Sequence, residues 1–192
     1  MLSREEFKNK YPNGFYGKDL NNPRNKKGIW NSCEWIGDKM YRVRSEMIIL
    51  KDVDTVYPKI FIGPKSSRKE YNIPGGSTEP KYDAIKTAIK ETQEEARINT
   101  KQVKLISKYV DNLSHTWDII LNDDNETKIK YDGNIVYVCV SQYDSVFNGY
   151  VSKSDRDDKM YKEGKFLPLE LYSCILTDAH RNAVNTYLAT IK

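Results

Sequence analysis

The stretch from Tyr71 to Ile98, YNIPGGSTEPKYDAIKTAIKETQEEARI, constrains the fold of this chain more than any other. Pro74-Gly75-Gly76 is a turn signal that closes a short apolar run, and Pro80 stands where a helix is expected to begin. Residues 82–96 contain no Gly or Pro, and their apolar residues recur at spacings of three and four. The pattern predicts a strand, a tight loop and a helix with one buried face.

Three carboxylates crowd the C-terminal part of this predicted helix. Glu91 and Glu95 are one turn apart, and Glu94 lies three residues after Glu91. Carboxylates at this end of a helix meet the negative end of its dipole and repel one another, so a bound cation would stabilise them. Oxygen ligands at this density suit Mg²⁺ or Mn²⁺, which share their coordination with substrate phosphates. The alternative is a solvated acidic face balanced by Lys86 and Lys90.

The loop and the helix together resemble the Nudix box. Its pattern is Gly, five residues, Glu, seven residues, and then Arg-Glu-apolar-any-Glu-Glu-any-Gly-apolar. With Gly76 in the first position, Glu91, Glu94 and Glu95 take the three later glutamate positions, and Ile98 takes the closing apolar one. The resemblance therefore covers the loop, the helix and all three carboxylates.

The chain departs from the Nudix pattern at four positions. Tyr82 replaces the first Glu, Lys90 the Arg, Thr92 the apolar residue and Arg97 the Gly. Tyr82 and Lys90 cannot form the ion pair with which the family braces its loop against the helix, and Asp83 could partly substitute. A Gly just past a helix often takes a positive φ, which is costly for a residue with a Cβ. We therefore expect an altered helix exit at Arg97.

The resemblance implies a fold and an activity. The expected fold is α/β, a Nudix-type α/β/α sandwich with a central mixed β-sheet formed by residues 40–192, preceded by an N-terminal arm of residues 1–39. The expected activity is Mg²⁺-dependent (or Mn²⁺-dependent) hydrolysis of the pyrophosphate linkage of a nucleoside diphosphate joined to another moiety, such as ADP-ribose, a nucleotide sugar or a dinucleotide. The alternatives are a catalytically weakened nucleotide-binding module and an RNA cap-removing hydrolase.

The resemblance also implies roles for the residues of the motif. Glu91, Glu94 and Glu95 are the expected catalytic residues and metal ligands, and the carbonyl of Gly76 or of Gly75 completes the metal shell. The family often places its general base outside the motif. The candidates for that base, which the sequence does not rank, are Glu126, Asp155 and Glu163.

Candidate substrate-binding residues lie outside the motif. Arg42 and Arg44 share one side of a predicted strand over residues 40–50, where they are either solvated or a fork for phosphate. Arg68 lies in the polar loop before the motif and is a further phosphate candidate. Trp35 or Trp30 could stack on a nucleobase. The resemblance makes a small-molecule nucleotide the expected partner, with RNA left open.

The remaining pattern extends the predicted sheet and adds a final helix. Strands are predicted over residues 57–63, 103–110 and 135–140, and a hairpin over 115–131 with its turn at 122–125. Residues 141–164 are polar, and a mobile loop over the site is predicted at 152–158. The final helix is capped by Thr177 or Asp178. Its predicted apolar stripe comprises Ala183, Val184, Tyr187, Leu188 and Ile191.

Composition limits the class of protein. The 192 residues carry a net charge of +4, with three separated cysteines and two histidines, which argues against a disulfide framework or a zinc site. No apolar run approaches the length of a bilayer, and the start MLSREEFKNK lacks a signal-peptide core. We expect a soluble cytoplasmic protein with no membrane partner.

The N-terminal arm of residues 1–39 is rich in aromatic residues, so we expect it to pack on the domain or to complete a homodimer.

Overall fold

The computed structural model describes most of the chain, namely residues 2–19, 28–64, 70–112, 119–121, 128–152 and 158–191. The chain groups into two compact units. Unit 1 comprises residues 1–44, 77–82 and 110–136, and unit 2 comprises residues 45–76, 83–109 and 137–192. Within the described ranges, no helix is long and apolar enough to cross a membrane.

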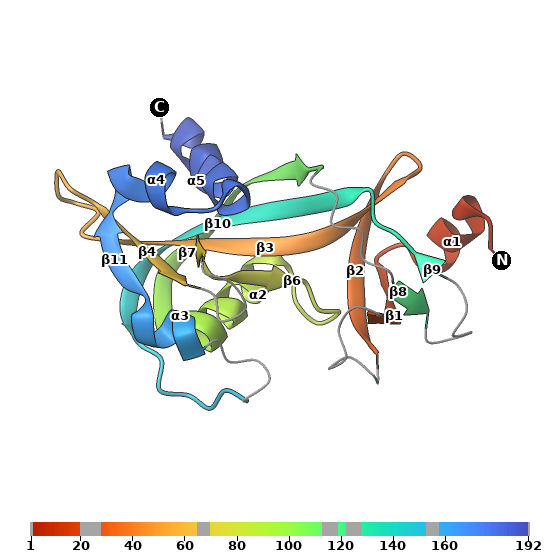
Figure 1. The fold of residues 1–192 in the computed structure, drawn as a ribbon, viewed down its shortest axis with the longest axis horizontal. Coiled ribbons are helices and arrows are strands. Elements are labelled where there is room, and N and C mark those ends of the chain that lie inside the picture. The colour runs from red at the N-terminus through yellow and green to blue at the C-terminus, as the bar shows by residue number, and fades with distance from the viewer. Residues whose placement is uncertain are drawn as a thin grey trace. The chain divides into compact units, whose positions relative to one another are not determined.

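The elements are labelled in Figure 1. The strands are β1 (Gly14–Asp19), β2 (Ile29–Ile36), β3 (Lys39–Lys51), β4 (Lys59–Pro64), β5 (Tyr71–Asn72), β6 (Gly75–Ser77), β7 (Ile98–Asp111), β8 (Ile119–Leu121), β9 (Lys128–Ile129), β10 (Gly133–Val146) and β11 (Lys165–Pro168). The helical segments are α1 (Arg4–Lys10), α2 (Ala84–Glu91), the π-helical turn η2 (Thr92–Ala96), α3 (Asp158–Glu163), the 3-10 turn η3 (Leu169–Leu171), α4 (Tyr172–Ile175) and α5 (Asp178–Thr190).

The sheet of unit 2 buries a hydrophobic core on each face. Successive side chains of a strand point to opposite faces, so the continuous apolar run of β3 supplies both cores. One core packs under α5 and consists of Ile48, Leu50, Ile60, Ile62, Ile73, Val138, Leu176, Ala183 and Val184. The other packs under α2 and α3 and consists of Met47, Ile49, Phe61, Ala88, Ala96, Ile98, Cys139 and Met160.

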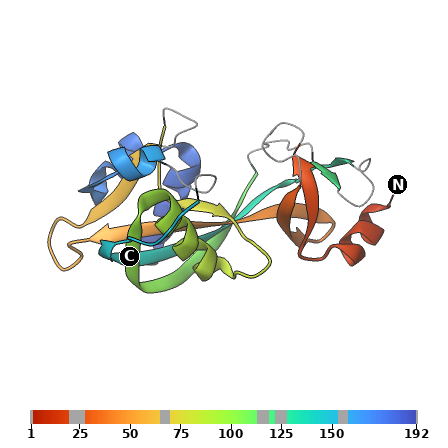
Figure 2. The ribbon, with the colours of Figure 1, turned by 90° about the horizontal axis from the view of Figure 1, so that it is seen from below.

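The helices of unit 2 cover both faces of this sheet. Figure 1 shows α4 and α5 on one side of β3 and β10, and α2 and α3 on the other. Seen from below in Figure 2, α2 lies over the near face of these strands. The order of pairing places β10 between β3 and β7, and β4 between β3 and β11. The predicted α/β/α sandwich is confirmed.

Strand β10 runs beyond its predicted end. The strand was predicted over residues 135–140, and it continues to Val146 although the residues after 140 are polar. Ser141 is buried and Tyr143 packs against the core under α2, so alternate residues still face inward. Residues 158–163 form α3, and residues 153–157 of the predicted mobile loop lie outside the described residues.

The C-terminal helix agrees with its prediction except at the end. Thr177 occupies the N-cap position of α5, but its hydroxyl donates to Oδ1 of Asn72 (3.2 Å). Ala183 and Val184 are fully buried, as the predicted stripe requires. Ile191 does not continue that stripe, because the helix ends at Thr190 and leaves the Ile191 side chain 60% exposed.

The predicted N-terminal arm contributes to the core of unit 1. Strands β2, β1, β8 and β9 pair in that order, and the β8–β9 hairpin confirms the prediction, with its turn outside the described residues. The core consists of Phe7, Phe15, Cys33, Met40, Leu121, Ile129 and Tyr131. Phe15 is 1% exposed and stacks at 6.2 Å between ring centroids on Tyr131. The aromatic residues of the arm therefore pack against a distant segment of the same chain.

The predicted boundary at residue 39 differs from the observed grouping. Strand β2 pairs antiparallel with the start of β3, where Cys33 lies opposite Arg42 and Trp35 opposite Met40. This hairpin keeps residues 40–44 with the N-terminal elements in unit 1. Pairing across a hairpin outweighs the change in composition on which the predicted boundary was placed.

The helix that carries the three glutamates has an unusual C-terminal end. The α-helix stops at Glu91 and continues as the π-helical turn η2. Arg97 then takes φ 57° and ψ 41°, the left-handed conformation in which the Nudix pattern has Gly. The Arg97 side chain offsets part of this cost, because Nη1 donates to the carbonyl of Gly149 at 2.7 Å and the guanidinium lies over the ring of Tyr161. The altered exit expected at Arg97 is therefore not found, because Arg97 keeps the left-handed conformation that the Gly of the pattern favours.

The packing of the arm predicts a large effect for truncation of its buried ring. Phe15→Ala should lower the free energy of unfolding by about 3–5 kcal/mol, because it leaves a cavity in a closed aromatic core. Tyr16→Ala on the same strand is the control, since Tyr16 is 55% exposed and its ring contact with Trp30 is worth at most about 1.5 kcal/mol. Urea unfolding followed by tryptophan fluorescence measures both. Equal losses for the two variants would contradict the described packing of the arm.

The strain at Arg97 can be separated from its side-chain contacts. Arg97→Ala and Arg97→Gly both remove the contacts with Gly149 and Tyr161, but only Gly relieves the left-handed conformation. We expect the Gly variant to be more stable than the Ala variant by about 1 kcal/mol. Thermal unfolding by calorimetry gives the difference. An Ala variant as stable as the Gly variant would mean that Arg97 has an ordinary backbone conformation.

Candidate active site

The loop before the helix lies directly against β3. The carbonyl of Pro74 accepts a hydrogen bond from the N–H of Met47 (2.9 Å). A Cβ on Gly75 would lie 2.7 Å from the carbonyl oxygen of Ser45 and 3.1 Å from the Cα of Glu46. A side chain at Gly75 would have to displace backbone, so this close approach requires glycine.

Two of the three glutamates meet the two glycines of this loop. The Glu95 side chain is buried, and its Oε2 accepts a hydrogen bond from the N–H of Gly75 at 3.0 Å. Glu91 lies against Gly76, where a Cβ would stand 2.2 Å from Oε1 of the carboxylate. A charged hydrogen bond of this kind compensates part of the cost of burying Glu95. Gly75 and Gly76, predicted as part of a turn, are in fact the first residues of strand β6, which pairs with β3. The predicted carboxylates Glu91 and Glu95 lie against these two glycines.

The third glutamate has a different partner. Oε2 of Glu94 accepts from Nζ of Lys90 at 2.8 Å, one helical turn away. Lys90 stands at the Arg position of the pattern. In the family that Arg pairs with the first Glu, which is Tyr82 here, and Lys90 pairs with Glu94 instead. Asp83, suggested as a substitute for that Glu, is the N-cap of α2 and accepts from the N–H of Lys86 at 2.8 Å.

Sequence reasoning missed one carboxylate next to this loop. Glu46 is 2% exposed on β3, and its Cγ would lie 2.9 Å from a Cβ on Gly75. Its Oε2 lies 3.3 Å from Nδ1 of His180 on α5. The signal was present in the sequence, because Glu46 directly precedes the apolar run at residues 47–50, and a buried carboxyl group needs a partner.

The other predicted residues are not part of this cluster. Arg42 and Arg44 lie on the unit 1 part of β3, both partly exposed, and Arg68 lies outside the described residues. Trp35 packs at the edge of the unit 1 core, donates from Nε1 to the carbonyl of Tyr11 (3.4 Å), and has Arg4 over its ring at 5.8 Å. Phosphate binding by the arginines and base stacking by Trp35 stay predictions.

The candidates for a general base are equally untested. Glu126 and Asp155 lie outside the described residues, and Glu163 is exposed near the end of α3 in unit 2. The cysteines supply no nucleophile here. Burial raises the pKa of the Cys33 and Cys139 thiols to about 12, so both stay protonated at neutral pH.

The donor set next to the glycine turn fits a hard divalent cation. In the described parts of the chain, no three His, Cys, Asp or Glu side chains converge as a ready-made metal site. Mg²⁺ does not need one, because it is commonly held by one or two carboxylates, with waters and substrate phosphates as its other ligands. Glu91, Glu95 and the carbonyl of Gly76 are oxygen donors of that kind in one short segment of the structure.

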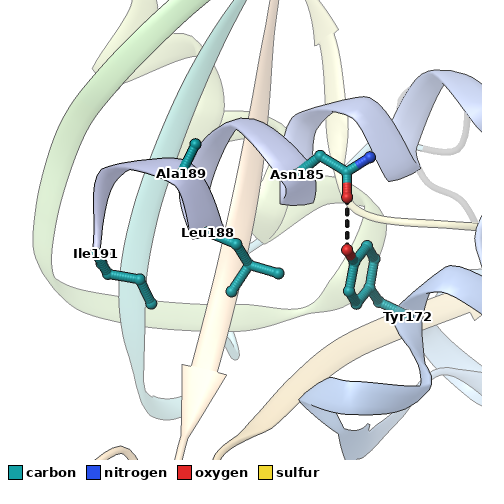
Figure 3. Close-up of a pocket in the computed structure, with 5 residues that line it drawn as sticks. All are labelled: Tyr172, Asn185, Leu188, Ala189 and Ile191. Atoms are coloured by element: carbon teal, nitrogen blue, oxygen red, sulfur yellow. Dashed lines mark hydrogen bonds between the residues drawn. The ribbon is translucent and has the colours of Figure 1, made fainter.

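A shallow pocket lies elsewhere in unit 2. It is lined by Tyr172 of α4 and by Asn185, Leu188, Ala189 and Ile191 at the end of α5 (Figure 3). The Tyr172 hydroxyl donates to Oδ1 of Asn185 at 2.5 Å. None of the five lining side chains carries a charge for phosphate or a cation, so the carboxylate cluster is the better candidate for chemistry.

Comparison by sequence finds no match, either to a family model or to a curated protein. Comparison by structure finds solved proteins with a similar arrangement of the chain. A NUDIX hydrolase from Nitrosomonas europaea is 15% identical, with 78% of this chain and 90% of that chain covered and a TM-score of 0.52. The NUDIX domain of Shewanella oneidensis NrtR, complexed with ADP ribose, is 9% identical, with coverage of 78% and 88% and a TM-score of 0.51. An Ap4A hydrolase from C. elegans is 14% identical, with coverage of 80% and 100% and a TM-score of 0.50.

These likenesses agree with the motif and with the sandwich of unit 2. At identities of 9–15% they establish the arrangement of the chain and not its chemistry. The glycine turn and the glutamate helix were recognised from sequence, and the layers around them were then found in the structure. The chain has the Nudix fold.

Proposed function

We propose that the chain is a divalent-metal-dependent hydrolase that cleaves the pyrophosphate linkage of a nucleoside diphosphate joined to another moiety. One observation carries the proposal. Glu95 accepts a hydrogen bond from the N–H of Gly75 and Glu91 lies against Gly76, so two carboxylates adjoin a stretch of backbone that carries no side chains. The Nudix fold supports the assignment by analogy.

The chain's residues would hold the metal ion that neutralises the charge of the substrate and activates the attacking water. Mg²⁺ or Mn²⁺, when bound, neutralises phosphate charge and lowers the pKa of a bound water. Glu95 is the first ligand we assign, because the N–H of Gly75 fixes the direction of its carboxylate. Glu91 and the carbonyl of Gly76 are the next. In the reaction, water attacks one phosphorus of the pyrophosphate and gives up its proton to a base. The bridging P–O bond breaks, which gives the nucleoside monophosphate and the phosphate ester of the second moiety.

Glu94 is our candidate for the group that accepts the proton of the water. Its carboxylate follows Glu91 by three residues and precedes Glu95 by one, and Nζ of Lys90 holds it at 2.8 Å. Glu163 is the described alternative from another element. The identity of the second moiety is decided by side chains outside the motif, so ADP-ribose, a nucleotide sugar and a dinucleotide are equal members of the proposed substrate class.

A nucleotide-binding module without turnover is the competing function. It is favoured by the absence of three converging metal-ligating side chains among the described residues. Tyr82, Thr92 and Arg97 are the departures from the Nudix pattern that such a loss of activity would involve. Retention of all three glutamates favours the hydrolase. Assays over ADP-ribose, nucleotide sugars, dinucleotides, nucleoside triphosphates and capped RNA, each with Mg²⁺ and Mn²⁺, distinguish the two.

Replacement of the buried carboxylate should abolish most of the activity. Glu95→Gln keeps the shape of the side chain but removes its charge, and we expect kcat to fall by about a hundredfold or more, since several kcal/mol of charge stabilisation is lost. Glu170→Gln is the control, because Glu170 is an exposed residue of η3 in the same unit. Release of the nucleoside monophosphate at saturating substrate, followed by chromatography, measures both variants.

Metal binding is measured independently of turnover. Mg²⁺ should raise the melting temperature of the protein and of the Glu170→Gln variant, and should raise that of Glu95→Gln less, because a ligand of the folded state stabilises it by mass action. Full turnover in EDTA, or by the Gln variant, would reject the proposed ligand. Equal melting shifts in all three proteins would place the ion elsewhere.

The two glycines of the turn should respond differently to alanine. In Gly76→Ala the new Cβ meets the mobile end of Glu91, so the carboxylate moves aside and the free energy of unfolding should change by at most about 1 kcal/mol. In Gly75→Ala the Cβ meets the backbone of Ser45 and Glu46, which should cost about 1–3 kcal/mol. We expect Gly76→Ala to be stable but at least tenfold less active. Calorimetry and release of the nucleoside monophosphate, measured on the same samples, test this. An active Gly76→Ala enzyme would remove Glu91 from the reaction.

A further inference from the structure

Glu46 is a buried charge in the apolar layer under α5. It lies on the same face of β3 as Ile48 and Leu50, both of which belong to that hydrophobic core. A carboxylate at this depth costs free energy unless it is paired, and an apolar side chain of similar size would pack there without that cost. The presence of Glu46 on this face therefore calls for a role other than packing.

The partner of Glu46 comes from the first turn of α5. Nδ1 of His180 lies 3.3 Å from Oε2 of Glu46, an ion-pair distance, and the side chains are only 12% and 3% exposed. Helix α5 is fixed at the same level by a second contact, the hydrogen bond from the Tyr109 hydroxyl to the carbonyl of Ala179 (3.0 Å). The imidazole is thus held over the strand by the docking of the helix.

The same glutamate supports the glycine turn. Gly75 lies on the Cα and Cγ of Glu46, so closely that no Cβ fits between them. The N–H of Gly75 donates to Glu95, while the adjacent carbonyl of Pro74 accepts from Met47. Gly75 is therefore held between β3 on one side and the glutamate helix on the other. A change in the position of the Glu46 side chain would shift the backbone group that orients Glu95.

We propose that Glu46 and His180 are positioning residues of the proposed active site, which fix the glycine turn on the side opposite Glu95. This inference rests on the hydrolase function proposed above. Both side chains are too buried to touch a substrate, so they act through Gly75 and the direction of the Glu95 carboxylate. The sequence motif contains neither residue.

Such a role has a kinetic signature that differs from that of a binding residue. Glu46→Gln and His180→Gln should each lower kcat by about 10- to 100-fold, the usual effect of removing a partner that orients a ligand, and should leave KM within about twofold. The double variant should be no worse than either single one, because the two residues act as one unit. It also replaces both side chains with neutral amides, so neither position can carry a buried charge.

The position of the turn can be measured without turnover. The exchange rate of the Gly75 amide hydrogen in ¹⁵N-labelled protein, without added metal, reports the hydrogen bond to Glu95. We expect exchange at Gly75 to be at least about tenfold faster in both single variants. Tyr109→Phe is the matched control, because it removes a contact of the same helix with the sheet and leaves the turn alone. Its Gly75 exchange should equal that of the unaltered protein.

The outcomes separate this inference from the proposed function. Unchanged Gly75 exchange in folded Glu46→Gln, His180→Gln or double variants overturns the positioning role, and so does equal acceleration in Tyr109→Phe, which would indicate general loosening of α5. A protein that hydrolyses no substrate of the panel refutes the hydrolase. In that case, faster Gly75 exchange in the single variants alone still establishes that the pair fixes the turn.

Discussion

The close contact of Gly75 with β3 is the interaction on which the candidate site depends. The absence of a side chain lets the turn lie on the backbone of Ser45 and Glu46. From that position its N–H meets the buried carboxylate of Glu95. A buried carboxylate is tolerated where it accepts a hydrogen bond from the backbone, and its direction is then set by the sheet. The strand, the turn and the helix thus form one rigid arrangement.

The end of the glutamate helix has an unfavourable local backbone conformation that accompanies this arrangement. A π-helical turn holds one more residue per turn than an α-helix, and such turns are frequent at functional sites. Here it contains Glu94 and Glu95, and it is followed by Arg97 in a conformation that favours glycine. The backbone geometry expected of the Nudix pattern is thus kept although its glycine is not. Local strain of this kind persists where the surrounding packing determines the conformation.

Local patterns in the sequence were sufficient to predict most of the helices and strands of unit 2. The spacing of apolar residues predicted the glutamate helix, and the apolar runs at 40–50, 57–63 and 135–140 predicted central strands. The errors occurred where side chains from distant segments decided the structure. β10 extends through Ser141 and Tyr143 because they pack under α2, and the N-terminal hairpin joins unit 1 because its aromatic rings meet Leu121 and Tyr131. Neither contact can be predicted from residues that are close together in the sequence.

The sequence by itself determined the order of strand, glycine turn and glutamate helix, because helix periodicity and backbone sterics act over a few residues. It also determined which carboxylates are grouped there. The tertiary structure decided how those groups are used: Glu95 meets Gly75, Glu94 pairs with Lys90, and Glu46 meets His180. Burial made these choices, since a charge removed from water takes whichever partner the packing of distant segments brings to it.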